Sequence, residues 1–381
     1  RELKSAKEDT TKVKILNLLS VEYRKSNPEK SYSNSKNALA LSRKINWPKG
    51  SAVSLINIGV YNELKGEYAK ALKCYYESLK IDESLGDKCG MAIDFSNIGN
   101  IYAFQQNYTK ALDYYFRGLS IDEKNKNKPG IAITLANIGI VYDELGNNNK
   151  ALNYYLKALK LEEELGNKGG ISMNLGNIGS IYGEEAEEET NKYVKDSLNK
   201  QKMDFFFKAL KIKKEIQDKN GIAIWTGNIG NDFLLQGNYH EAERYLKEAI
   251  SYSREIGAKE YLNEQHEALS GLYRLTGDKK NAFKNYKLHI AYKDSLMNEA
   301  NIKNQTQLEM QYEFDKTQAA DSIKNAERAT QENLKNQEEI NRPKLSTYGG
   351  IISFLLMVVV AIISFKAFKN TQQANILIAN K

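Results

Sequence analysis

Proline and cysteine are scarce in this sequence, and the catalytic motifs of the common enzyme classes are missing. Among 381 residues there are four prolines and two cysteines. Few segments alternate β-branched and polar residues in the manner of a half-buried strand. With so few helix-breaking prolines as well, the sequence predicts helix throughout. Length alone would allow two or three compact domains.

The two cysteines, Cys74 and Cys89, are 15 positions apart and lack the spacing of metal ligands. They could form a disulfide in an oxidising compartment, although sequence cannot establish the geometry that this bond needs. Two unpaired thiols are the favoured interpretation.

The sequence contains no phosphate-binding loop, no H-E-x-x-H zinc pair and no G-x-S-x-G nucleophile elbow. Its three histidines, His240, His266 and His289, have no partner at metal-ligand spacing. For His240 and His289 the favoured interpretation is an exposed or hydrogen-bonded helix residue. We therefore expect no catalytic centre, metal or cofactor within these residues.

Charge of one sign is not concentrated anywhere in the chain. The formal net charge is +7, but lysines and acidic residues alternate along almost the whole sequence. A nucleic-acid surface would need its basic residues on one face. The charge pattern favours solvated helices and argues against a nucleic-acid partner.

What the sequence does contain is a repeat. The tripeptide Asn-Ile-Gly begins at Asn57, Asn97, Asn137, Asn177 and Asn228, which are 40, 40, 40 and 51 residues apart. A period near 40 residues without strand signals predicts stacked helical hairpins. A single hairpin could not bury its apolar stripe, so each must pack against its neighbour.

The hydrophobic spacing within one period fits this prediction. In residues 91–123, Phe95, Ile98, Gly99 and Tyr102 share one helical face, and Ala111, Tyr115 and Gly118 mark the face of a second helix. Gly99 and Ala111 would let the two axes approach closely, while the rings of Tyr102 and Tyr115 would fill the space around that contact.

The order of small residue, aromatic, alanine and aromatic resembles the tetratricopeptide repeat (TPR), whose standard unit has about 34 residues. A 40-residue unit implies a longer second helix and exit loop. Weaker copies at Asn17-Leu18-Leu19 and Ala268-Leu269-Ser270 extend the array. The resemblance therefore predicts an all-α solenoid of about seven hairpins over residues 10–297, with degenerate ends that serve as caps.

Some units depart from the pattern. Tyr61 stands one position early in the second unit, and Lys202 replaces the expected alanine in the fifth. The fifth unit also carries an insertion at about 183–200. An acidic segment of this kind is typical of a solvated helix extension, but insertions can also form binding loops.

The recurring asparagines are the candidate binding residues. In tetratricopeptide arrays the first helices line a concave groove, and the resemblance implies that Asn57, Asn97, Asn137, Asn177 and Asn228 face it. Asn100 and Asn231 lie on the same helical side. Primary amides can hydrogen-bond an extended peptide without reading its sequence. Alternatively, these asparagines belong to the repeat consensus and serve contacts between hairpins.

Other groove-side candidates contain no lysine or arginine: Val60, Ala103, Ile140, Asp143 and Ser180. A clamp for a terminal carboxylate would need such cations at these positions. The groove is therefore not expected to take acidic C-terminal tails.

Beyond the repeats, residues 298–342 predict a polar helix with a faint coiled-coil seam at Leu308, Tyr312, Ala319, Ile323 and Ala326. This seam suggests a homodimer. Residues 346–365 are uncharged and, as a helix, long enough to cross a bilayer, with Tyr348, Lys366 and Lys369 near the interfaces. Residues 366–381 continue as helix and look cut, and Arg1 suggests that a preceding segment is missing.

The layout of repeats, polar helix, membrane span and emerging helix resembles bacterial signalling proteins whose output domain is a histidine kinase or a PP2C-like phosphatase. This resemblance implies a single-pass inner-membrane protein with a periplasmic array and a cytoplasmic C-terminus. The lysine and arginine counts on the two sides of the span do not decide the orientation. The alternative is a membrane-anchored scaffold without an output domain.

Overall fold

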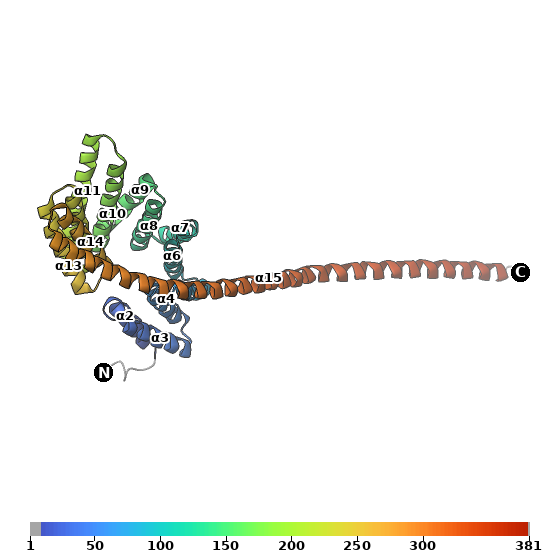
Figure 1. Ribbon diagram of the computed structural model, residues 1–381. Helices are drawn as coiled ribbons and strands as arrows, with labels where there is room; N and C mark the ends of the chain where they lie inside the picture. Colours follow the sequence, from blue (N-terminus) through green and yellow to red (C-terminus); the bar gives the residue numbers. More distant parts are fainter. Residues whose placement is uncertain (1–8, 380–381) are drawn as a thin grey trace. The chain divides into compact units, whose positions relative to one another are not determined.

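The computed structural model describes the backbone of residues 9–379. Within that range, the side chains of residues 25, 297–326, 337–348 and 373–379 are not described. All described secondary structure is helical (Figure 1). Contacts divide the chain into two units, residues 1–312 and 313–381. The predicted all-α solenoid of stacked hairpins is confirmed for the first unit.

Helices in the first unit follow one another as consecutive packed pairs, joined by short turns. Within the described residues there are seven pairs: α2 (Thr10–Ser26) with α3 (Pro28–Lys44), α4 (Pro48–Leu64) with α5 (Tyr68–Leu85), α6 (Lys88–Phe104) with α7 (Tyr108–Asn125), α8 (Lys128–Glu144) with α9 (Asn148–Leu165), α10 (Lys168–Glu188) with α11 (Lys192–Glu215), α12 (Lys219–Leu235) with α13 (Tyr239–Ile256), and α14 (Lys259–Leu275) with the beginning of α15 (Lys279–Ala379).

Asparagine and aspartate fix where many of these helices begin. The side chain of Asn107 accepts a hydrogen bond from the backbone N–H of Lys110 at the start of α7, and Asp87 accepts one from the N–H of Gly90 at the start of α6. Such caps satisfy backbone donors that have no partner inside the helix. The sequence therefore sets the turns between hairpins locally.

Each middle pair is held together by a glycine of its first helix against a large side chain of its second. A Cβ on Gly99 would lie 2.6 Å from a ring carbon of Tyr115, and the Tyr115 ring is 2% exposed. Only a residue without a side chain lets the ring come this close. The same contact recurs in Gly59–Tyr75, Gly139–Tyr155, Gly179–Phe206 and Gly230–Leu246.

A second aromatic contact also repeats from pair to pair. Tyr102 stacks on Tyr114, with ring centroids 5.6 Å apart, rather than beside Tyr115 as the sequence suggested. Equivalent stacks are Tyr142–Tyr154, Tyr182–Phe205 and Phe233–Tyr245. Each such pair adds a directional contact to the burial of its two rings.

The second pair has polar residues at the positions of this stack. There the amide of Asn62 lies 3.9 Å from the sulfur of Cys74, while Tyr61 stacks on Tyr32 of the preceding pair. Cys74 is half-buried and Cys89 is exposed, and both are free. The favoured interpretation of two unpaired thiols is confirmed.

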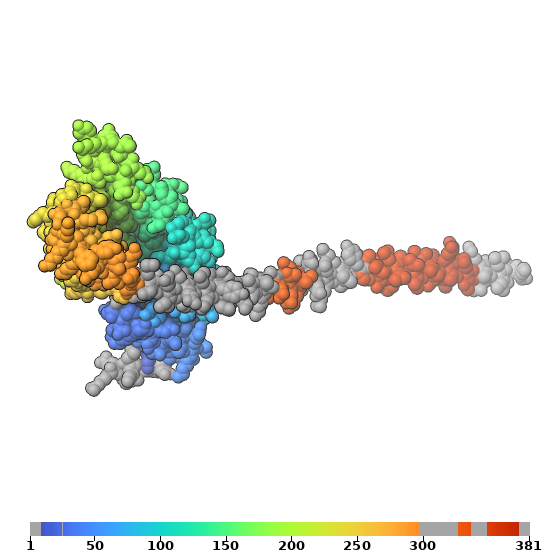
Figure 2. Space-filling model, in the orientation of Figure 1, coloured from blue at the N-terminus to red at the C-terminus, as the bar shows by residue number. Residues whose placement is uncertain are grey.

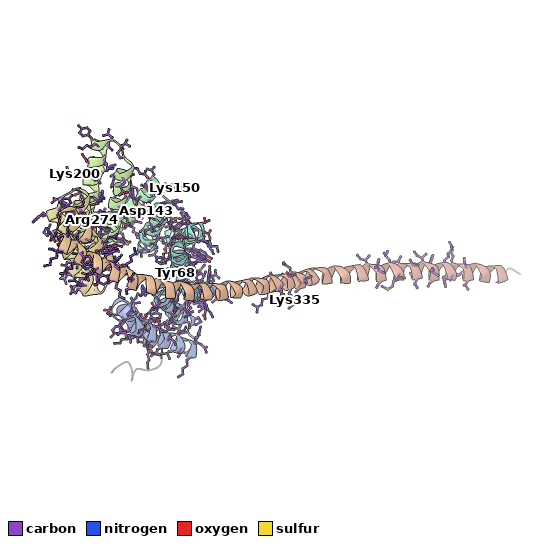
Figure 3. The ribbon with its side chains drawn as sticks, viewed as in Figure 1. Tyr68, Asp143, Lys150, Lys200, Arg274 and Lys335 are labelled. Atoms are coloured by element: carbon purple, nitrogen blue, oxygen red, sulfur yellow. The ribbon has the colours of Figure 1, made fainter. Side chains whose placement is uncertain are left out.

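The insertion in the fifth pair lengthens both helices, so that α10 has 21 residues and α11 has 24. Lys200 lies in the lengthened part of α11 with its side chain exposed (Figure 3). Lys202, the residue at the alanine position, forms a nearly buried ion pair of 2.5 Å with Asp232 of α12. Its charge is thus compensated inside the array rather than exposed to water.

The second unit contains the later part of α15. Its segment Gly349–Gln372 is long and apolar enough to cross a membrane, with a mean hydropathy of 2.6, and no part of it is covered by protein (Figure 2). The side chains of the predicted coiled-coil seam, Leu308 to Ala326, lie outside the described residues.

The contact between Gly99 and Tyr115 makes a stability prediction. Gly99→Ala should lower the free energy of unfolding by about 1–3 kcal/mol, because the added methyl group overlaps a buried ring that cannot move away. The measurement is urea unfolding followed by circular dichroism.

Gly169→Ala is the matched control, because the nearest atom to a Cβ there is 3.5 Å away. It should leave stability unchanged or raise it by up to about 1 kcal/mol. Equal destabilisation by the two substitutions would contradict the proposed role of the glycine–ring contact.

Candidate functional site

The first helices of successive pairs lie on the inner side of the stack. Contacts join α2 to α4, α4 to α6, α6 to α8, α8 to α10 and α12 to α14. Among the described residues, no contact of similar extent joins the second helices of neighbouring pairs. In a curved stack the inner helices are the closer ones. The exposed face of the first helices is therefore the candidate binding surface.

Residues of the predicted asparagine ladder are less free than the sequence suggested. Asn57 is 5% exposed; its amide donates to Asn17 Oδ1 at 3.2 Å, and its own oxygen accepts from Arg24 at 3.2 Å. Both partners belong to the preceding pair of helices. Asn57 therefore serves a contact between hairpins, which is the alternative that the sequence left open.

Two further candidates also pair across the stack. The amide of Asn137 donates to Asn100 Oδ1 at 3.1 Å, and the hydroxyl of Tyr115 donates to the same oxygen at 2.7 Å. The remaining predicted residues, Asn97, Asn177, Asn228 and Asn231, are half-buried. The ladder thus combines contacts between repeats with amide groups that reach the surface.

Beside the asparagines runs a row of aliphatic side chains that sequence reasoning missed. Each stands four residues before an asparagine of the ladder, on the same face of its helix. They are Val53, Ile93, Ile133, Met173 and Ile224. The first four side chains are 42%, 49%, 53% and 41% exposed, in that order, and Ile224 is half-buried. The same 40-residue period would have revealed them.

These positions form one continuous feature, which we call the inner stripe. It consists of the aliphatic row, the five asparagines, and a third row three residues further along: Val60, Asn100, Ile140, Ser180 and Asn231. Apolar groups in the stripe can bury partner side chains, and amides can pair with partner backbone. The chemistry suits a polypeptide segment more than a small charged ligand.

Two buried carboxylates between α5 and α6 have shifted pKa values, which is often a mark of a functional site. Asp94 is 0% exposed and Asp82 is 2% exposed. Burial raises the pKa of Asp94 to about 8 and that of Asp82 to about 6; Asp82, Asp87 and Lys49 are the charged groups nearby.

The setting of this acid pair is structural. No described cavity is lined by either residue. Asp122 and Glu162 repeat the position of Asp82 and are also buried, while neutral Thr134 and Asn174 repeat that of Asp94. The acids thus occupy junctions between neighbouring hairpins, and a substrate has no access to them.

The three histidines lie in different surroundings. His240 is exposed beside Glu241, whereas His289 is buried with Nδ1 3.3 Å from the carbonyl oxygen of Asn263. His266 is buried in the last pair and contacts Asn285. Within the described residues, no three histidine, cysteine or acidic side chains are grouped as metal ligands.

Comparison with known families agrees with the repeat geometry. Residues 52–85, 92–164 and 223–256 each match a tetratricopeptide repeat family. These helical pairs are tetratricopeptide repeats. A comparison with curated proteins finds no match.

Solved TPR-like structures share the fold at low sequence identity. The apo form of RapI is 16% identical with a TM-score of 0.55, covering 75% of this chain and 99% of that chain. A STAND protein with a tetratricopeptide repeat sensor from Pyrococcus horikoshii is also 16% identical, with a TM-score of 0.55, covering 77% and 44%. A Rap protein complexed with competence and sporulation factor is 12% identical, with a TM-score of 0.50, covering 81% and 99%.

The buried acid in the third TPR gives a pH prediction. The pKa of Asp94 is higher in the folded chain than the ordinary value near 3.8, so its stabilising protonated form is lost as the pH rises towards 8. Asp94→Asn should therefore raise the thermal midpoint at pH 9 and flatten its decline between pH 5 and pH 9.

Asp204→Asn on α11 is the control, because this exposed carboxylate pairs with Lys208 at the surface. It should leave the pH profile unchanged. A wild-type profile retained by Asp94→Asn would show that Asp94 is ionised in the folded chain throughout this range.

Proposed function

We propose that this chain is a membrane-anchored interaction module that holds an extended protein segment along its inner stripe. TPR repeats support a protein–protein interaction module. The observation that carries the proposal is the recurrence of an aliphatic position, exposed on the first four of five consecutive first helices, beside an asparagine that is half-buried on the last four. Packing of the hydrophobic core does not account for a row of exposed aliphatic side chains, and contiguous exposed apolar residues are typical of interaction surfaces.

In this proposal the two chemistries of the inner stripe have different tasks. The aliphatic row, for which Ile93 and Ile133 are the most exposed members, supplies affinity by covering apolar side chains of the partner. Half-buried amides such as those of Asn97 and Asn177 bond to the partner's backbone. Asn57 and Asn137 hold adjacent repeats in register, so the rows stay aligned.

The membrane part of the proposal rests on the uncovered apolar segment Gly349–Gln372. We place the array in the periplasm and residues 366–381 in the cytoplasm, as the input portion of a bacterial signalling protein. Ligand binding would change the packing of the last repeats, and α15, which begins in the seventh pair, would carry that change towards the membrane. Homodimerisation through residues 298–342 is part of the same proposal.

Changing the aliphatic row should weaken binding without unfolding the array. The probe is a set of peptides selected from a random displayed library for binding to the full chain in detergent. Ile93→Asp combined with Ile133→Asp should weaken the affinity of the selected peptides by at least about tenfold, since charged groups replace central apolar contacts.

The asparagines are tested with the same peptides. Asn97→Ala, Asn137→Ala and Asn177→Ala combined should abolish peptide binding while helicity, measured by circular dichroism, is retained.

Leu156→Asp is the matched control, because Leu156 is 48% exposed on α9, a second helix outside the inner stripe. It should leave peptide affinity within about twofold. Selected peptides that bind all three variants equally would place the binding surface elsewhere.

The native cysteines offer a test of orientation. Cys89 is exposed, whereas burial raises the pKa of the half-buried Cys74 to about 11, which suppresses its thiolate. A membrane-impermeant maleimide added to intact bacterial spheroplasts should therefore label Cys89 alone.

The Cys89→Ser variant should remain unlabelled in the same spheroplasts. Labelling of the wild-type chain only after the cells are lysed would contradict a periplasmic array.

A further inference from the structure

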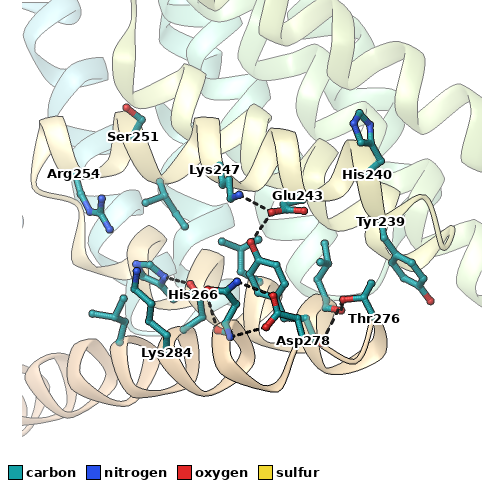
Figure 4. Close-up of a pocket in the computed structure, with 17 residues that line it drawn as sticks. Tyr239, His240, Glu243, Lys247, Ser251, Arg254, His266, Thr276, Asp278 and Lys284 are labelled. Carbon is teal, nitrogen blue, oxygen red and sulfur yellow. Dashed lines mark hydrogen bonds and ion pairs between the residues drawn. The ribbon is translucent and has the colours of Figure 1, made fainter.

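A cavity of about 930 Å³ lies between α13, α14 and the beginning of α15 (Figure 4). It is separate from the inner stripe, since its lining comes largely from the second helices of the last two repeats. Its volume is in the range of small-molecule sites.

The last repeat lacks a ring at the position that faces this cavity. Asn285 occupies the position at which earlier repeats place the second member of the aromatic stack, namely Tyr114, Tyr154, Phe205 and Tyr245. Its neighbour His266 stands where earlier repeats bury Phe95, Leu135 or Leu175. Polar side chains have therefore replaced two core positions in this repeat.

At one end of the cavity the polar groups already have partners. Glu243 accepts from Lys247 at 2.5 Å and from the hydroxyl of Tyr273 at 2.6 Å. Asp278 accepts from the backbone and side-chain N–H groups of Asn281 at 3.0 and 2.7 Å. These acids are thus occupied by groups of the chain itself.

The other end carries positive charge without a counter-ion. Arg254 of α13 and Lys284 of α15 line the cavity close to His266, and neither forms an ion pair among the described residues (Figure 4). His266 is 3% exposed, and its Nε2 has no hydrogen-bond partner. A buried polar atom without a partner is costly unless something fills the site.

The hydrogen bonds around Asn285 fix the state of this ring. The Asn285 amide nitrogen donates to the carbonyl oxygen of Asn281 at 2.9 Å, so its oxygen faces His266 Nδ1 at 2.8 Å. An amide oxygen only accepts, and Nδ1 therefore carries a hydrogen. The ring lines the cavity and stacks on Tyr292, and its Nε2 is buried without a hydrogen-bond partner.

We propose that this cavity binds a small oxyanion, a carboxylate or a phosphate group, between Arg254, Lys284 and Nε2 of His266. The two cations attract the anion, and a protonated Nε2 donates a hydrogen bond to it. At the far end, Glu243 and Asp278 are already hydrogen-bonded within the chain, so that part of the cavity can hold the uncharged remainder of a larger ligand. This site does not depend on the function of the inner stripe.

Proton uptake should accompany binding. In the empty cavity, burial lowers the pKa of His266, and the charges of Arg254 and Lys284 lower it further. A bound anion offsets those charges and favours the protonated ring, so it raises this pKa. Affinity for the anion should therefore increase as the pH falls and decline as the pH rises through the pKa of the bound state.

The experiment is a histidine titration by nuclear magnetic resonance on the full chain in detergent, labelled at its three histidines. It compares sodium sulfate, as the phosphate-type probe, and sodium acetate with sodium chloride at equal ionic strength. At saturation, one or both probes should raise the pKa of His266 by about one unit, equivalent to a tenfold preference for the protonated ring. Sodium chloride at equal ionic strength is the control, because His240 also lines the cavity.

Arg254→Gln combined with Lys284→Gln should abolish the anion effect, whereas Lys287→Gln, which removes an exposed charge outside the cavity on the same helix, should preserve it. A response to sulfate alone identifies a phosphate-type site, to acetate alone a carboxylate site, and to both a general oxyanion site. No response of His266 beyond that seen in sodium chloride, or a response retained by the double variant, would overturn the proposal.

Discussion

The array depends on the close approach of two helix axes at a glycine. In the middle pairs, a bare backbone position such as Gly99 lies against a ring such as that of Tyr115, which leaves the ring almost wholly buried. This contact sets the distance between helices and buries only part of the apolar surface of each pair. The rest must be covered by the next pair, and stacking of repeats follows from that requirement.

Regular stacking converts a sequence period into a surface. Because each pair repeats the same approach, equivalent residues of successive first helices point in the same direction. The inner stripe is the result, with Ile93 and Ile133 exposed and Asn100 bonded to Asn137 between them. Amides of the stripe thus hold the repeats in register, and the aliphatic row provides most of its exposed apolar area.

Departures from the repeat occur where polar residues enter the packing. In the second repeat Asn62 and Cys74 replace the stacked rings, and in the fifth Lys202 is neutralised by Asp232. Both substitutions find partners within the array. The seventh repeat differs, because Asn285 and His266 satisfy each other only in part and leave the buried Nε2 of His266 without a partner, near two cations that form no ion pair among the described residues. This difference is the reason for the anion site proposed in the seventh repeat.

The helical class, the hairpin period and the glycines of the close contacts can be predicted from the sequence, because they follow from local propensity and from spacing along one helix. The sequence also marked the apolar segment near the C-terminus by composition. Sequence patterns could not predict that Tyr102 stacks on Tyr114, that Asn57 is enclosed by Asn17 and Arg24, or that Asn285 lines a cavity. These features join residues of different helices, and their geometry depends on how the pairs pack together. The tertiary structure alone decided which polar residues support the stack and which remain available to a partner.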